Sequence, residues 1–151
     1  MENRDRDLPL ENGARIAVVG AGPAGCFFAH FATEAAARRG LSLDILLYDG
    51  KSFARGGPAG CNMCAGVVAP TLVSRLESMG LELPESVVQR RIDRYWLETP
   101  VGRVSLLPPE GQGAIYTIFR GNGPRGAAPG GKMSLDEDLL TMVRRMGVTV
   151  I

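Results

Sequence analysis

A glycine-rich stretch near the N-terminus has the composition and spacing of a phosphate-binding turn. It follows the apolar run 16–19, precedes an alanine-rich segment, and consists of Gly20, Ala21, Gly22, Pro23, Ala24 and Gly25. A turn of this kind between a strand and a helix aims backbone amides and the positive end of the helix dipole at an anion. We expect the amides of Ala24, Gly25 and Cys26 to face that anion. The pattern therefore predicts a site for the pyrophosphate of an adenine dinucleotide.

Three glycines and a proline have separate roles in this prediction. Gly20 would allow a sharp turn off the strand, and Gly22, which has no Cβ, would let the backbone approach a phosphate. Gly25 would let the helix pack closely on the strand. Pro23 suits the first helical position, because its fixed φ is helical and an amide there would have no partner within the helix.

An aspartate, Asp49, follows the next apolar run, 43–48. If the two runs are neighbouring parallel strands, we expect Asp49 to accept hydrogen bonds from the adenosine ribose hydroxyls. Its charge would repel a ribose phosphate, which argues against a phosphorylated nicotinamide cofactor. The competing interpretations are a glycine-rich turn without a ligand and an Asp-Gly turn at 49–50.

The alanine-rich segment predicts a long, largely buried helix over 23–39, with Phe27, Phe28 and Phe31 on its apolar surface. His30, the only histidine, lies inside this helix. We interpret it as a packed or hydrogen-bonded residue rather than a catalytic one, because no nucleophile or set of metal ligands accompanies it.

Composition sets the outer limits. The chain of 151 residues is 45% hydrophobic and suits a globular unit that follows an N-terminal tail, 1–13. Its 17 basic and 16 acidic residues give no electrostatic case for binding nucleic acid. No apolar stretch approaches the roughly 18 residues of a membrane span, so we expect no transmembrane segment, and peripheral membrane contact stays open. Three cysteines and a charged N-terminus unlike a signal peptide favour a cytoplasmic location.

The middle of the chain has a different pattern. A glycine-rich loop precedes a short helix expected over 70–79. Extended segments are then expected over 87–99, 101–107 and 115–119. Together they predict an antiparallel inset, residues 84–120, on the substrate side of the protein. Arg90, Arg91 and Arg94 are interpreted as part of a solvated sheet face in preference to a contact with an anionic substrate.

A pair of cysteines, Cys61 and Cys64, has C-x-x-C spacing. Such a pair can form a redox disulfide or supply half of a four-ligand metal site. The third cysteine, Cys26, lies in the first helix, so we predict no metal site. We favour ordinary loop residues over a redox role for this pair. A thioredoxin-type C-x-x-C pair normally lies at the start of a helix that follows a strand, whereas this pair lies in a glycine-rich loop.

A second glycine-rich segment, 121–131, lacks the Gly-Lys-Ser/Thr ending of a phosphate-binding loop. We interpret it as a flexible connection.

The C-terminal segment predicts an amphipathic helix over 133–146. Ser134 is its expected N-cap, Glu137 the capping-box partner, and Gly147 the stop. Residues 148–151 then begin a strand. Because a domain seldom ends inside a buried strand, we expect the domain to be truncated and the chain to be the N-terminal portion of a longer protein.

Taken together, these motifs resemble the flavin-dependent reductases and hydroxylases that bind FAD through an N-terminal dinucleotide-binding half, and among them the geranylgeranyl reductase family. The matching positions are 20–25 with Ala29, Asp49, 64–68 and 132–139. The resemblance implies an α/β, Rossmann-like FAD/NAD(P)-binding fold with a parallel sheet and a small antiparallel β inset. Residues 14–151 would be the N-terminal part of the FAD-binding domain.

The resemblance also implies roles for individual positions. Residues 20–25 would hold the FAD pyrophosphate and Asp49 the ribose, while the loop with Cys64, Gly66 and Val67 would lie along the flavin. Relatives often have Arg-x-x-Phe-Asp where this sequence has Lys132 and Leu135, and lysine cannot reproduce a bidentate guanidinium contact. The Gly-Asp pair that meets the ribityl chain in relatives is not present in the sequence. We therefore expect these residues alone to bind FAD weakly or not at all and to be inactive.

The implied activity is that of an FAD-dependent oxidoreductase. In that chemistry reduced flavin transfers hydride to a double bond of an apolar or prenyl-type small molecule, and an external donor supplies the electrons. No catalytic residue is identified, and we expect the catalytic groups beyond residue 151. The alternatives are a flavin-dependent monooxygenase and a noncatalytic dinucleotide-binding module.

Overall fold

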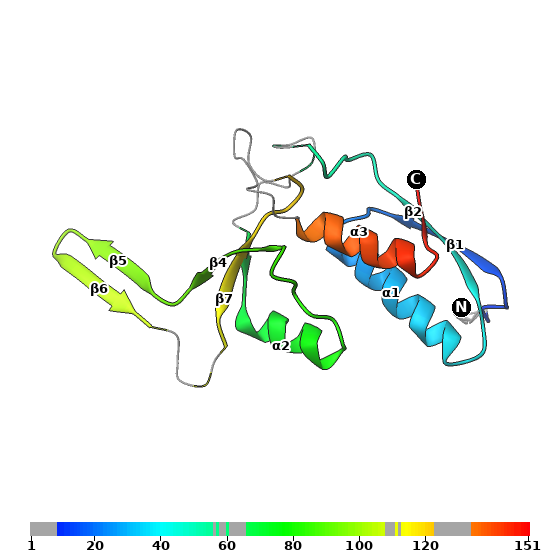
Figure 1. Cartoon of the computed structure of the whole chain (residues 1–151), viewed down its shortest axis with the longest axis horizontal. Coiled ribbons are helices and arrows are strands. Elements are labelled where there is room, and N and C mark those ends of the chain that lie inside the picture. The colour runs from blue at the N-terminus through cyan, green and yellow to red at the C-terminus, as the bar shows by residue number, and fades with distance from the viewer. Residues whose placement is uncertain are drawn as a thin grey trace, which may run out of the picture. The chain divides into compact units, whose positions relative to one another are not determined.

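The protein is described by a computed structural model, shown in Figure 1, over residues 9–55, 57, 60, 66–107, 111, 113–122 and 134–151. Its architecture is mixed α/β, with one parallel sheet and two separate antiparallel sheets. The chain divides into two compact units. We call Met1–Gly50 with Leu139–Ile151 the parallel unit, and Lys51–Asp138 the antiparallel unit.

The parallel unit contains a three-stranded sheet. Its elements are β1 (Ala14–Val19), α1 (Pro23–Ala37), β2 (Leu43–Tyr48), the part of α3 (Leu135–Arg145) from Leu139 onward, and β8 (Thr149–Val150). The strand order is β1-β2-β8, and both pairings are parallel. Parallel strands need a crossover connection, and α1 provides it between β1 and β2. The expected α/β class and parallel sheet are confirmed.

The central strand of this sheet is the most buried. Ile45 and Leu47 on β2 are buried, as are Leu140 and Val143 on α3. In the described part of the chain, β1 pairs only with β2, and alternate β1 residues are exposed. Val19 at the end of β1 is 91% exposed. The core of the unit therefore lies around β2, and β1 forms an edge of the described sheet.

Helix α1 is buried along one face, with Phe27 and Phe31 partly buried and Phe28 exposed. Its buried residues are Cys26, Ala29, His30 and Ala36. Phe28 is half exposed, so its expected burial is wrong. Three of these four side chains are small, and the helix backbone approaches the sheet closely at Gly25. His30 is buried as expected, and its Nδ1 lies 3.1 Å from Met146 Sδ.

The antiparallel unit contains two small sheets and one whole helix. Its elements are β3 (Val67–Val68), α2 (Pro70–Ser78), β4 (Val88–Ile92), β5 (Tyr95–Thr99), β6 (Gly102–Leu106) and β7 (Ile115–Ile118). The strand orders are β3-β7-β4 and β5-β6. Val68, Val87 and Ile118 form its buried core cluster.

The predicted inset is antiparallel, but its strands differ from the expected ones. The single segment expected over 87–99 is two strands, because β4 pairs with β7 while β5 pairs with β6. The short strand β3 was missed, since two residues are too few to show a sequence pattern. Helix α2 and the turn between β5 and β6 lie where the sequence places them.

Helix α3 has the predicted start and stop. The Oγ of Ser134 accepts a hydrogen bond from the amide of Glu137 at 3.1 Å, which is the N-cap interaction. At the other end Gly147 has φ +90°, and the amide of Val148 donates to the carbonyl of Val143 at 3.1 Å. This ending is typical of a helix closed by a glycine in the left-handed region.

A buried ion pair lies at the start of α3, within the antiparallel unit. The Asp136 carboxylate accepts hydrogen bonds from Arg120 Nε at 2.7 Å, from Arg120 Nη2 at 2.9 Å and from the amide of Gly121 at 2.7 Å. The Asp136 side chain is 1% exposed. Its three donors compensate the cost of burying the charge. The pair joins the end of β7 to the first turn of α3.

We predict that Asp136→Ala lowers the free energy of unfolding by about 3 kcal/mol, because it leaves the Arg120 guanidinium and the Gly121 amide without their partner. Urea denaturation measures the change. Asp44→Ala is the matched control, because its carboxylate pairs with Arg15 in the open at 2.7 Å. Exposed pairs contribute little, so the control should lose much less. Equal losses in the two variants would contradict the importance of the buried pair.

Candidate functional site

Residues 20–25, which we call the glycine loop, turn sharply off β1 as the sequence predicts. Gly20 has φ +104°, a backbone conformation that residues other than glycine rarely adopt. Its amide donates to the carbonyl of Tyr48 at 2.7 Å. The start of the glycine loop is therefore tied to the end of the neighbouring strand, β2.

Gly25 permits the close approach of α1 to the sheet. A Cβ placed on Gly25 would lie 1.9 Å from the carbonyl oxygen of Gly20 and 3.3 Å from Leu47 Cδ1. A separation of 1.9 Å is a severe overlap with rigid backbone, so no other residue fits without displacing the helix. The expected packing role of Gly25 is confirmed.

The N-terminus of α1 begins immediately after Gly22. Gly22 is the N-cap, and Pro23 occupies the first turn as predicted. The amide of Cys26 donates to the carbonyl of Gly22 at 3.0 Å, so the expectation that this amide is free for a ligand is wrong. The amides of Ala24 and Gly25 precede that first helical bond and lie at the positive end of the helix dipole.

The carboxylate of Asp49 lies against the glycine loop. Its Oδ2 accepts a hydrogen bond from the amide of Ala21 at 2.7 Å. The parallel register explains this contact, because Val19 pairs with Tyr48 and the two strands end side by side. The sequence places Asp49 correctly at this edge of the sheet. It does not reveal that one carboxylate oxygen already binds the loop.

The carbonyl of Ala21 has a side-chain partner of its own. The Sγ of Cys26 donates to it at 3.2 Å, and both residues are fully buried. Two successive peptide groups of the loop are thus held by side chains, one by Asp49 and the next by Cys26. We call this pair of hydrogen bonds the Ala21 clamp. Sequence reasoning missed the contribution of Cys26. The signal that could have revealed it is the position of Cys26 in the first turns of the helix, five residues after Ala21.

The flavin-side residues predicted from the resemblance lie in a different part of the chain, and their role in the site stays a prediction. Gly66 and Val67 lie in the antiparallel unit. The carbonyl of Gly66 accepts from the amide of Ile118 at 2.7 Å, and a Cβ on Gly66 would lie 2.3 Å from the carbonyl oxygen of Ile118. Gly66 therefore has a packing role beside β7. Cys61, Cys64 and Lys132 fall outside the described residues.

Two searches for other kinds of site give negative results for the described residues. No group of three or more histidine, cysteine, aspartate or glutamate side chains there could hold a metal ion. None of the helices in the same ranges has both the length and the apolar character needed to cross a bilayer.

Comparison with known proteins adds no relative. No family model matches the sequence, and no curated protein matches it. The resemblance to flavin-dependent reductases stays a prediction that is carried by the motifs.

We predict that Gly25→Ala lowers the free energy of unfolding by about 3 kcal/mol, because the added methyl group overlaps the Gly20 carbonyl and forces α1 away from the sheet. Gly50→Ala is the matched control, since a Cβ there meets nothing within 4 Å. Urea denaturation of both variants measures the difference. A Gly25→Ala variant as stable as Gly50→Ala would contradict the close packing of α1.

Proposed function

We propose that the parallel unit binds an adenine dinucleotide and that this dinucleotide is FAD. The glycine loop and the N-terminus of α1 would receive the pyrophosphate, and Asp49 would receive the adenosine ribose. The observation that carries the proposal is the 2.7 Å hydrogen bond from the Ala21 amide to Asp49 Oδ2. This contact places Asp49, the acidic residue of the dinucleotide-binding pattern, beside the glycine loop that would hold the phosphates.

The conformation of Gly22 supports a bound anion. Gly20 and Gly25 have structural reasons to be glycine, namely a positive φ and a close backbone contact. Gly22 has φ −73° and ψ −175°, which any residue adopts. A glycine at this N-cap position fits a ligand that approaches the backbone, although glycine is also favoured at N-caps.

The strand order supports a Rossmann-like fold. In such folds the first strand carries the glycine turn, the second lies beside it and the third lies beyond the second. The order β1-β2-β8 in the parallel unit follows this sequence, and the glycine loop is at the carboxyl end of β1. Ligands of open α/β sheets bind at that end of the strands.

The chain's own groups would perform binding and selection. The amides of Ala24 and Gly25 would donate to phosphate oxygens, and the helix dipole would offset part of their charge. Asp49 would accept from ribose hydroxyls and disfavour a ribose that carries a phosphate. When bound, FAD supplies hydride-transfer chemistry.

The finer assignment follows the motifs of the sequence. We propose an FAD-dependent oxidoreductase similar to geranylgeranyl reductases, acting on an apolar or prenyl-type substrate with an external electron donor. The segment with Gly66 and Val67 would lie along the flavin.

We predict that the chain binds ADP, which carries both the diphosphate and the ribose, and that Gly22→Val abolishes this binding, because a branched side chain would occupy the phosphate position. Displacement of a fluorescent ADP analogue by ADP measures the affinity. NAD should compete better than NADP, since Asp49 would repel the additional phosphate. Gly113→Val, in the antiparallel unit, is the control for a glycine replaced outside the loop, because a Cβ there makes only an ordinary contact with Pro70 Cβ at 3.6 Å. Failure of both FAD and ADP to bind the unaltered chain would overturn the proposal.

We predict that Asp49→Ala weakens ADP binding by about tenfold and that Asp49→Asn weakens it less. Asparagine keeps an oxygen that can accept from the Ala21 amide, whereas alanine removes the acceptor and leaves the loop amide without it. The same fluorescence competition compares the two variants. Unchanged affinity in both would show that the carboxylate does not contribute to the site.

A further inference from the structure

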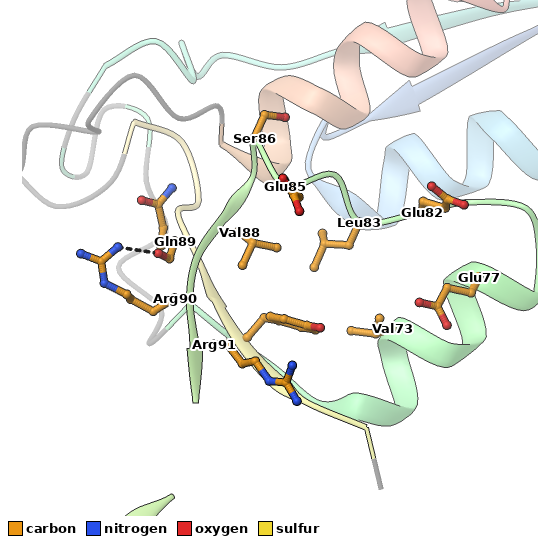
Figure 2. A pocket seen from close by; sticks show the side chains of 11 residues that line it. Val73, Glu77, Glu82, Leu83, Glu85, Ser86, Val88, Gln89, Arg90 and Arg91 are labelled. Carbon is orange, nitrogen blue, oxygen red and sulfur yellow. Dashed lines mark hydrogen bonds between the residues drawn. The ribbon is translucent and has the colours of Figure 1, made fainter. Parts of the chain in front are cut away.

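A cavity of about 760 Å³ lies within the antiparallel unit. Helix α2, the connection after it, β4 and β7 contribute its walls, and Figure 2 shows the side chains that line it. This volume falls in the range of small-molecule sites, which is about 300–1,000 Å³. None of the glycine-loop residues lines the cavity, so it is a separate feature from the proposed dinucleotide site.

The cavity has an apolar floor, which is formed by Val73, Leu83, Val88 and Tyr116. Val73 and Leu83 also pack against the buried core cluster of the unit, so the floor is backed by well-packed side chains. A preformed apolar floor favours a ligand with an apolar body, because little reorganisation is needed to bind it.

One arginine faces this side of the sheet and its neighbour does not. Arg91 pairs directly opposite Tyr116, and residues directly opposite in an antiparallel pair share one face. Arg90 is the next residue and lies on the other face. Figure 2 shows its side chain directed away from the cavity, with a 2.8 Å hydrogen bond from Nη1 to the Gln89 carbonyl.

Carboxylates outnumber the guanidinium at the cavity. Glu77 lies one helical turn after Val73 on α2, and Glu82 and Glu85 lie on the connection between α2 and β4. The lining contains three glutamates and two arginines, and the guanidinium of Arg90 is directed away from it. This excess of carboxylates favours a positively charged ligand.

We propose that this cavity binds an organic cation with an apolar body, of the substituted ammonium class. The apolar floor would contact the body of the ligand, and the ring of Tyr116 would attract its charge through a cation–π interaction. Glu77 and Glu82 would supply the opposite charge at the rim. Binding here needs neither FAD nor the glycine loop.

The test uses two probes of similar size and opposite charge, benzyltrimethylammonium and phenylacetate. Each is titrated into the intact chain and followed by NMR chemical shifts. We expect saturable binding of benzyltrimethylammonium, with shifts at Tyr116 and Val73, and at least about threefold weaker binding of phenylacetate. Equal or tighter binding of phenylacetate, or no saturation by the cation, would overturn the proposal.

Charge variants locate the site. The double variant Glu77→Gln with Glu82→Gln should weaken cation binding by at least about threefold, because two rim charges are lost. Both side chains are exposed, so the fold should tolerate the change. Glu11→Gln removes an exposed charge in the parallel unit and is the matched control, with no expected effect. Equal affinity in the double variant and the control would reject the cavity as the cation site.

Discussion

The parallel unit depends on the hydrogen bond between the Ala21 amide and the Asp49 carboxylate. It joins the turn after β1 to the residue after β2, and it can form only when the two strands pair in the observed parallel register. A slip of one residue would turn Asp49 to the other face of the sheet. The same register that builds the sheet therefore also places the carboxylate at the glycine loop.

Close packing at Gly25 imposes a second constraint on the same unit. Because α1 approaches the sheet at the Gly20 carbonyl, the side chains near that contact, Cys26 and Ala29, are small. That proximity is what allows the Cys26 thiol to reach the Ala21 carbonyl at 3.2 Å. The Ala21 clamp is thus a consequence of helix packing as well as of strand register, and the loop conformation is fixed from both directions.

Sequence reasoning predicted the local features of this structure and missed the long-range ones. The glycine turn, the Ser134 cap and the Gly147 stop depend on residues close together in the chain, and each lies where it was predicted. The pairing of Arg120 with Asp136 and the division of 87–99 into two strands depend on which segments meet in space. Hydrophobicity alone also misled, because it selected Phe28 for the buried face of α1, whereas Phe28 is half exposed and the smaller Cys26 and Ala29 are fully buried.

The two units would recognise ligands by different physical means. At the glycine loop backbone amides would bind the phosphates and the Asp49 carboxylate would select the ribose, so one side chain and the conformation of a few glycines set the ligand choice. At the cavity of the antiparallel unit the charges belong to exposed side chains such as Glu77 and Glu82. Salt screens exposed charges, and it also screens the attraction of a helix N-terminus for an anion. Both sites should therefore bind more weakly as salt is added, and they are separated by the sign of the ligand charge that each one favours.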